Sequence, residues 1–139
     1  MKTLEFDSIN EIIEIEDLDD EWLGYCIKTE KDTIEFKLWN GSSCCEKFYM
    51  DTSDVMNSLL GNKLISCDID VEDCDLSVFD PKSDVHECNG AMIYNERVIF
   101  KINTDNDPVY LVFGNIHNGY YSHRCEVILN GNCVCESWV

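Results

Sequence analysis

Three potential metal ligands, Cys74, His86 and Cys88, fall within one stretch of the sequence, and Cys67 precedes them on a segment that alternates like a strand. Thiolate and imidazole groups are the ligands that tetrahedral zinc prefers in proteins. Because residues 72–93 lack regular periodicity, a bound zinc ion would also explain how so long a loop is ordered. We therefore expect a structural zinc site built from Cys74, His86, Cys88 and Cys67.

Two other pairs of residues compete as ligands. Cys133 and Cys135 would share one face of a strand, and His123 and Cys125 would lie together on the apolar face of another. A histidine among apolar neighbours is most often a hydrogen-bonded core residue, and a cysteine there is most often packed. These alternatives leave the complete ligand set open.

The charge of the chain is strongly negative and unevenly distributed. Twenty-eight acidic and ten basic residues give a net charge of −18, beyond the magnitude of about 2 to 8 that solubility requires. Nine acidic residues lie in segment 1–22 and eight in segment 68–87. We expect two partner-binding acidic patches, one made of Asp68, Asp70, Glu72, Asp73 and Asp75 and the other of Glu14, Glu16, Asp17, Asp19 and Asp20.

These patches have two interpretations. A DNA duplex presents one negative charge per roughly 1.7 Å of its axis, so an acidic ridge could occupy a basic groove in its place. Alternatively, the two segments are separately solvated. Alternating carboxylates in the second segment could also bind calcium, but the EF-hand glycine and terminal glutamate are missing there.

Several classes of function are excluded or disfavoured. Basic residues occur singly, whereas direct binding to nucleic acid needs clustered Lys and Arg. No phosphate-binding loop, Ser-His-Asp order or His-Glu-x-x-His motif is present, so we expect a protein that is not an enzyme. No apolar run approaches the roughly 18 residues of a membrane helix, and no secretory signal opens the sequence, which favours a cytoplasmic location.

Apolar residues alternate with polar ones along most of the chain, which indicates strands. Leu23 to Ile27 and Ile34 to Leu38 predict a hairpin, and Asn40-Gly41 predicts a turn before the next strand. The expected strands after this hairpin cover residues 44–50, 65–71, 98–102, 109–113, 121–129 and 133–138.

Two segments predict helix instead. Residues 51–54 supply N-cap chemistry, an apolar stripe follows at Val55, Met56, Leu59 and Leu60, and Gly61 could end the helix. The capping-box spacing within residues 7–11 also predicts a short helix or an irregular start. The expected fold is therefore α+β: one domain, 1–139, with an antiparallel meander sheet, one principal short helix, an acidic segment 1–22 and an acidic Cys/His loop 72–93.

Five pieces of sequence follow one another between Gly24 and Leu129. They are Gly24-Tyr25, Asn40-Gly41, Cys44-Cys45-Glu46-Lys47-Phe48-Tyr49, Leu59-Leu60-Gly61-Asn62-Lys63-Leu64-Ile65 and Asn118-Gly119-Tyr120-Tyr121-Ser122. In these pieces the chain resembles a family of small, functionally uncharacterised domains from phages and bacteria. The resemblance implies that Cys44 and Cys45 are a feature of the fold and that the Cys/His loop was acquired by this chain. It does not imply any particular reaction.

The general character of the chain is also similar to that of zinc-containing anti-CRISPR proteins, which inhibit type II Cas9. This resemblance implies a phage-derived inhibitor, acting in the host bacterial cytoplasm, whose acidic patches bind a basic surface of a Cas9-like nuclease and hinder DNA loading. Cas9 holds its heteroduplex in a positively charged channel, which would give such an inhibitor a target. The alternative is a binding module that sequesters a small signalling molecule of a host defence system in a pocket lined by Trp39, Tyr120 and Tyr121.

Overall fold

Alternating inward and outward side chains turn almost all of the described chain into strands. The computed structural model describes residues 2–19, 21–39, 46–74, 94–117 and 123–139. These residues form nine strands: β1 (Lys2–Asp17), β2 (Trp22–Thr29), β3 (Thr33–Trp39), β4 (Glu46–Thr52), β5 (Lys63–Cys74), β6 (Tyr94–Thr104), β7 (Val109–His117), β8 (Arg124–Leu129) and β9 (Asn132–Trp138). All pairings between neighbouring strands are antiparallel.

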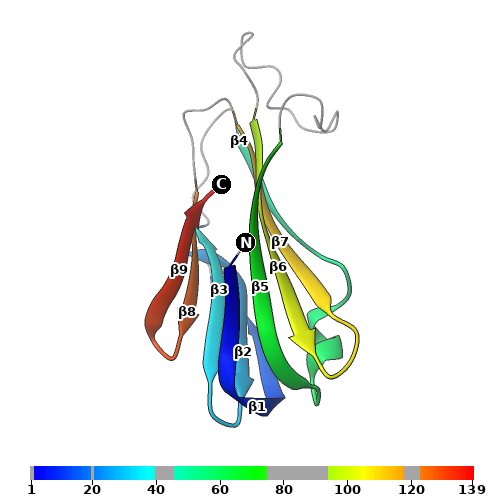
Figure 1. Ribbon diagram of the computed structural model, residues 1–139. Coiled ribbons are helices and arrows are strands. Elements are labelled where there is room, and N and C mark those ends of the chain that lie inside the picture. The colour runs from blue at the N-terminus through cyan, green and yellow to red at the C-terminus, as the bar shows by residue number, and fades with distance from the viewer. Residues whose placement is uncertain (1, 20, 40–45, 75–93, 118–122) are drawn as a thin grey trace.

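The strands form one continuous sheet in the order β4-β7-β6-β5-β1-β2-β3-β8-β9 (Figure 1). The long strand β1 joins its two halves. The first part of β1 pairs with β5, from Lys2 opposite Ile69 to Glu11 opposite Lys63. The last part pairs with β2 and ends with Asp17 opposite Tyr25. Register shifts interrupt both pairings, as expected where a strand bends from one half of a sheet into the other.

The apolar core lies between the two halves of the sheet. Phe36 of β3 contacts Phe100 of β6 with ring centroids 5.0 Å apart, and Phe100 meets Phe113 of β7 edge-on at 5.4 Å. All three rings are fully buried. Burying a side chain of this size contributes roughly 1.5 to 3 kcal/mol, so contacts of this kind hold the two halves together.

The predicted α+β class is wrong, because the described residues contain no α-helix. Residues 7–11 belong to β1, where Ile12 and Ile15 continue the strand pattern. In segment 51–61, β4 extends to Thr52 and only Met56–Leu59 form a short 3-10 helix, η1. Its N-cap residue, Val55, is extended and provides no side-chain cap. Only Met56 and Leu59 of the apolar stripe are buried, too few contacts to stabilise a longer helix.

The predicted strands agree better with the structure. The hairpin corresponds to β2 and β3, and each later strand segment overlaps one of β4 to β9. The order of strands is not a simple meander, however, because β1 lies between β5 and β2 and β7 separates β4 from β6. Of the predicted loop 72–93, residues 72–74 continue β5, and the rest lies outside the described residues. None of the described helical segments is long and apolar enough to cross a membrane.

Candidate functional site

The turn between β1 and β2 carries a dense group of carboxylates. Two main-chain hydrogen bonds close this turn: Leu18 N–H donates to the Gly24 carbonyl at 3.1 Å, and Trp22 N–H donates to the Asp19 carbonyl at 3.1 Å. Asp17 and Asp19 are exposed on either side of Leu18. The turn therefore holds its acidic side chains on a fixed backbone.

Gly24 allows β2 to enter this turn. Its φ of +137° lies in a region that residues with a Cβ rarely adopt. A Cβ added there would come within 1.8 Å of the Phe36 carbonyl oxygen and 3.2 Å of the Phe113 ring. The glycine thus lets the turn pack directly against the core.

The opposite wall is formed by the end of β4 and by η1. Ser53 N–H donates to the Tyr110 carbonyl at 2.9 Å, which holds the end of β4 against β7. Beyond η1, Gly61 N–H donates to the Ile12 carbonyl at 2.9 Å and Ile12 N–H donates to the Asn62 carbonyl at 2.8 Å. These bonds tie η1 to β1, so both walls are positioned by the same strand.

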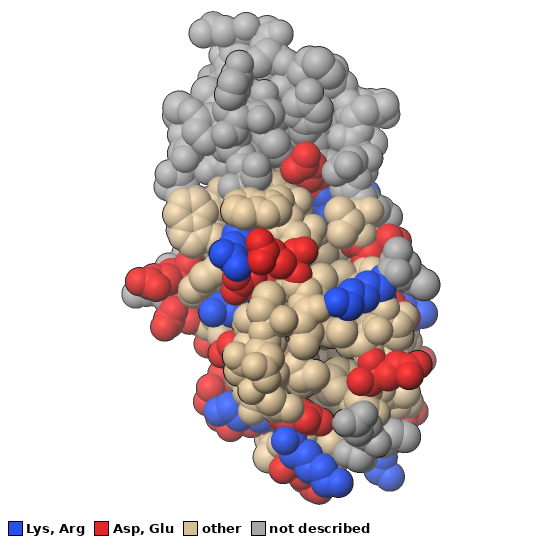
Figure 2. All heavy atoms as spheres, turned by 60° about the vertical axis from the view of Figure 1, so that its left-hand side comes forward, with Lys and Arg blue, Asp and Glu red and all other residues tan. Residues whose placement is uncertain are grey.

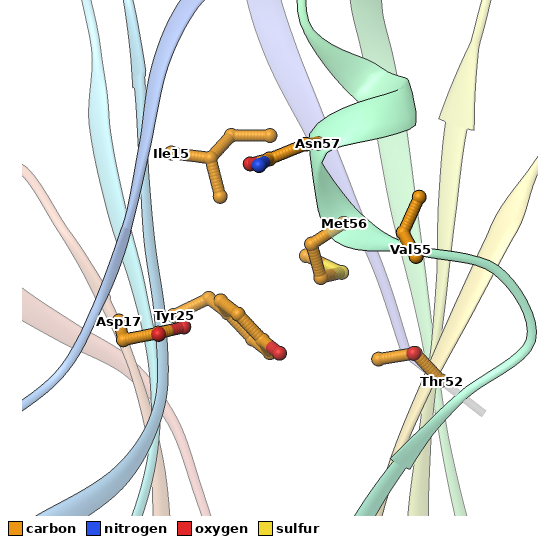
Figure 3. Close-up of a pocket in the computed structure, with 7 residues that line it drawn as sticks. All are labelled: Ile15, Asp17, Tyr25, Thr52, Val55, Met56 and Asn57. Carbon is orange, nitrogen blue, oxygen red and sulfur yellow. The ribbon is translucent and has the colours of Figure 1, made fainter.

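A cavity of about 360 Å³ lies between these walls. Figure 3 shows Ile15, Asp17 and Tyr25 on one side and the residues of β4 and η1 on the other, with Tyr25 extending into the space between. The residues that line it are Ile15, Asp17, Tyr25, Thr52, Val55, Met56 and Asn57. Its surface combines apolar side chains with one carboxylate, one phenol, one hydroxyl and one amide.

Two further hollows continue the cavity along the turn. The first, of about 320 Å³, shares Asp17 and Tyr25 with it and adds Met50 of β4. The second, of about 230 Å³, shares Asp19 with the first and reaches Lys37. We call the three together the β1–β2 groove.

The groove has a negative electrostatic character. Burial raises the pKa of the Tyr25 phenol, and the negative charge of Asp17 raises it further. At the far end, the Lys37 ammonium lies 4.3 Å from the centre of the Trp22 ring, in a hollow also lined by Asp19 and Glu21. This end of the groove thus already accommodates one cation of the chain itself.

The outer face of β1 carries a second pair of carboxylates. Lys28 of β2 lies 3.6 Å from Glu14 and 3.7 Å from Glu16. The pKa of Glu16 is raised, first by its hydrogen bond to Glu14 and then by the charge of that neighbour. The same hydrogen bond, followed by the charge of Lys28, lowers the pKa of Glu14, so the lysine stabilises one carboxylate of the pair more than the other.

The acidic patch on β5 lies elsewhere in the fold. Asp68 accepts hydrogen bonds from Thr3 at 2.8 Å and from Asn103 at 3.0 Å. These bonds, led by the one from Thr3, lower the pKa of the Asp68 carboxyl. Thr3 stands near the start of β1, whereas Asp17 is its last residue, so the two patches lie at opposite ends of the strand.

The remaining residues of the predicted acidic patches lie either on β5 or outside the described residues. Asp70 is exposed on β5. Glu72 and Asp73 stand on the same strand, opposite Arg97 and Glu96. Asp75 and Asp20 lie outside the described residues. In Figure 2, the acidic side chains of the described residues are interspersed with basic and uncharged ones and form no continuous ridge on the face shown.

The strand register separates two of the predicted zinc ligands. Cys67 pairs with Ile102 and Cys74 with Asn95, with no irregularity between them. At roughly 3.3 Å per residue, their Cα atoms are about 23 Å apart, whereas two thiolates on one zinc each lie at about 2.3 Å from it. Cys67 therefore cannot share a metal ion with Cys74. His86 and Cys88 lie outside the described residues.

Cys67 behaves as a core residue. Its side chain is 1% exposed, and burial, helped by the neighbouring Asp68 charge, raises the pKa of its thiol to about 12. A thiol with this pKa stays protonated at neutral pH and is a poor metal ligand and nucleophile.

The rival ligands are dispersed as well. His123 is buried, its Nδ1 lies 2.7 Å from the Trp39 carbonyl oxygen, and its ring contacts Trp39 and Phe48. Cys125 is also buried in the core. His123 and Cys125 thus fit the core interpretation better than the metal-ligand one.

Cys133 and Cys135 do not share a face as expected. The register of β8 and β9 shifts, so that Cys135 stands opposite the buried Val127 and Cys133 opposite Ile128. Cys135 is consequently half-buried and Cys133 exposed. The shift adds one residue to β9, which reverses the side-chain alternation at that point.

One group of possible ligands was not anticipated from the sequence. Single ligand atoms of Glu126, Cys133 and Glu136 lie within 4.8 Å of one another on the exposed side of β8 and β9. Arg124 forms ion pairs with both glutamates, at 2.5 Å to Glu126 and 3.0 Å to Glu136. Because the guanidinium already pairs with both carboxylates, the group is better explained as an ion-pair network than as a metal site.

A family model described as a domain of unknown function, DUF7448, matches residues 7–127. The chain belongs to this family. The matched span of the DUF7448 domain runs from within β1 into β8 and contains both walls of the β1–β2 groove. No curated protein and no solved structure matches the chain.

The pocket predicted from Trp39, Tyr120 and Tyr121 cannot be assembled from the described part of this DUF7448 chain. Trp39 contacts the His123 ring instead, and the two tyrosines lie outside the described residues. Sequence reasoning selected Asp17 and Asp19 for their charge but missed their position in a groove. The opposite wall comes from residues 50–57, and only the tertiary fold brings these next to the β1–β2 turn.

Proposed function

We propose that the protein is a non-catalytic binding module that attaches to a basic protein surface through the β1–β2 end of the fold. The observation that carries this proposal is the concentration of carboxylates there. Six acidic residues fall within positions 14–21 of the sequence, and the five that the structure describes are Glu14, Glu16, Asp17, Asp19 and Glu21. Among the described residues, Lys28 contacts Glu14 and Glu16, and Lys37 lies over the Trp22 ring, so two lysines stand beside these carboxylates.

The energetics of exposed charges favour a multivalent contact. A single solvent-exposed ion pair contributes only about 0 to 1 kcal/mol, so no one carboxylate would hold a partner. Several carboxylates on a rigid turn act together, and they also accelerate encounter with a surface of opposite charge. Binding by this end should therefore be fast, strongly dependent on salt and distributed over several residues.

A Cas9-like nuclease is the specific partner that we propose. Its nucleic-acid channel is basic over a long distance, and an acidic protein in that channel would hinder DNA loading. The chain's size and net charge of −18 support this choice, together with its resemblance to anti-CRISPR proteins. A structural zinc ion held by Cys74, His86 and Cys88 remains part of the proposal, without Cys67.

A small anionic ligand is a poorer fit to the same groove. The cavity volume falls within the range of small-molecule sites, roughly 300 to 1,000 Å³. However, Asp17 and Asp19 would repel nucleotide-like signalling molecules, which carry phosphate groups. The charge of the groove therefore favours a cationic occupant.

The decisive experiment compares binding to a Cas9–guide RNA complex before and after it is loaded with target DNA. We expect binding to the DNA-free complex and inhibition of subsequent DNA loading. Neutralising Glu14, Glu16, Asp17 and Asp19 together should abolish both effects. A matched variant that neutralises Glu5, Glu11, Glu30 and Asp107, four exposed carboxylates elsewhere, should retain them. Equal loss in both variants, or no binding by the wild type, would contradict the proposal.

A further inference from the structure

We infer that the β1–β2 groove receives an extended, basic segment of the partner, which adds as a strand to the free edge of β4. This inference rests on the proposed function and specifies how the partner is bound. It depends on three properties of the groove: the main-chain groups along its rim, its position, and its charge.

The main-chain groups of β4 are the first property. Within the described residues, β4 is the last strand of the sheet and pairs only with β7. Ser53 N–H donates to Tyr110 of β7. Because main-chain groups of an antiparallel strand alternate in direction, those of Asp51 also face β7, while those of Met50 and Thr52 face away.

Local side chains cover only part of this edge. The Asp51 carboxylate accepts a hydrogen bond from Thr52 N–H at 2.8 Å. Within the described residues, the Met50 N–H and carbonyl have no such partner on the side away from β7. One antiparallel residue pair with an incoming strand is therefore available at Met50.

The position of the groove is the second property. Met50 lines the hollow that also contains Asp17, Trp22 and Tyr25, and Thr52 lines the adjoining cavity with Asp17. Met50 and Thr52, whose main-chain groups face away from β7, thus border two of the three hollows of the groove. A segment that pairs with Met50 would pass directly beside the β1–β2 turn.

Charge is the third property, and it selects the occupant. Asp17 and Asp19 stand on one side of the groove, while Asp51 and Asp54 are exposed on the β4 side. A second copy of this chain, with a net charge of −18, would be repelled from this edge. A segment with Lys or Arg at alternate positions would place its cations beside these carboxylates, as Lys37 is placed over Trp22.

The other edge of the sheet is less suited to such a segment. Lys2 donates a hydrogen bond to the Val134 carbonyl of β9, so a cation of the chain itself already covers that strand. Arg124 forms ion pairs with both neighbouring carboxylates, Glu126 and Glu136. Within the described residues, the edge of β4 therefore offers main-chain groups beside the carboxylates of the groove, whereas cations of the chain itself lie along the edge of β9.

The test uses the full chain and a synthetic ten-residue peptide of alternating lysine and valine. Binding is measured by isothermal titration calorimetry, and exchange of the Met50 amide hydrogen is followed by NMR. We expect peptide binding to slow exchange of the Met50 amide about tenfold or more, because strand pairing protects an edge amide. The amide of Asp51, which faces β7 in both states, serves as the internal reference.

Two controls separate strand addition from simple charge attraction. A peptide of alternating lysine and proline keeps the charge but loses half of its main-chain donors and favours a polyproline II conformation over a strand, so it should bind at least about tenfold more weakly. In the protein, Asp17→Asn combined with Asp19→Asn should weaken the lysine–valine peptide, whereas Glu30→Gln combined with Asp107→Asn should not.

The outcomes distinguish this inference from the proposed function. Equal binding of both peptides without protection of Met50 would overturn strand addition and leave charge-driven docking in place. If the protein binds the Cas9 complex but neither peptide, strand addition is likewise overturned and charge-driven docking remains. Failure of the wild type to bind either the peptides or the nuclease would overturn both proposals.

Discussion

Asp17 of β1 and Tyr25 of β2 stand opposite each other in the strand register, and both side chains line the same cavity (Figure 3). This pair joins the acidic turn to the interior of the groove. Because the phenol is partly buried beside the carboxylate, its ionisation reports directly on the charge of the site.

Removing the Asp17 charge should lower the pKa of Tyr25 relative to the wild type. Burial would still keep the pKa of this phenol above its ordinary value in Asp17→Asn, but the repulsion of the phenolate by a carboxylate would be gone. The shift can be measured from the NMR signals of the tyrosine ring during an alkaline titration. An unchanged Tyr25 pKa in this variant would show that the two groups do not interact.

Gly24→Ala should be among the most destabilising single substitutions in the wall of the groove. The added Cβ would overlap the Phe36 carbonyl and the residue would keep a positive φ, so we expect a loss of several kcal/mol. Gly61→Ala is the matched control, because its φ is also positive but nothing lies within 4 Å of the new Cβ. It should cost only about 1 to 2 kcal/mol, as measured by denaturant unfolding. Equal costs would contradict the close contact at Gly24.

The buried thiol of Cys67 should make the protein sensitive to alkali. Its pKa of about 12 lies above that of an unfolded thiol, about 8.5, so the unfolded chain loses this proton first as the pH rises. The stabilisation is complete below the unfolded pKa and is lost progressively between pH 8.5 and 12. Cys67→Ala should show a smaller loss of unfolding free energy between pH 7 and pH 10.5 than Cys133→Ala, whose thiol is exposed.

Alkylation of the native protein should also rank these thiols. Iodoacetamide should modify Cys133 well before Cys67 and Cys125, because the first is exposed and the other two are buried. Peptide mass spectrometry of a time course at neutral pH measures this order, and unfolding in guanidinium should remove it. Early labelling of Cys67 would contradict its place in the core.

Zinc binding should be independent of Cys67. If Cys74, His86 and Cys88 hold a structural zinc ion, Cys88→Ser should reduce the zinc content of the purified protein, whereas Cys67→Ala should leave it unchanged. Elemental analysis by mass spectrometry gives the stoichiometry directly. Loss of zinc in Cys67→Ala alone would be incompatible with the distance along β5.

The strands could be predicted from sequence because alternation is a local property. The hairpin of β2 and β3 was recognised from the inward-facing Leu23, Ile27, Phe36 and their neighbours. The helix at 51–61 could not be excluded in this way, since its caps and apolar stripe are genuine local signals. Tertiary pairing of β4 with β7 as far as Thr52 overrides them, which no local pattern reveals.

The candidate site was predictable only in part. Charge alone identified Asp17 and Asp19, but the opposite wall at Met50 and Met56 depends on how β4 is placed in the sheet. The separation of Cys67 from Cys74 likewise depends on β5 continuing further than its alternation suggested. Long-range register, and not residue type, decides these features.

The measurement that tests the central claim most directly is the salt dependence of binding to the DNA-free Cas9–guide RNA complex. The dissociation constant should rise steeply between low and high salt for the wild type and for the variant neutralised at Glu5, Glu11, Glu30 and Asp107. For the variant neutralised at Glu14, Glu16, Asp17 and Asp19, we predict weak binding with a much shallower dependence. Strong binding by this last variant, with the slope of the wild type, would contradict the account.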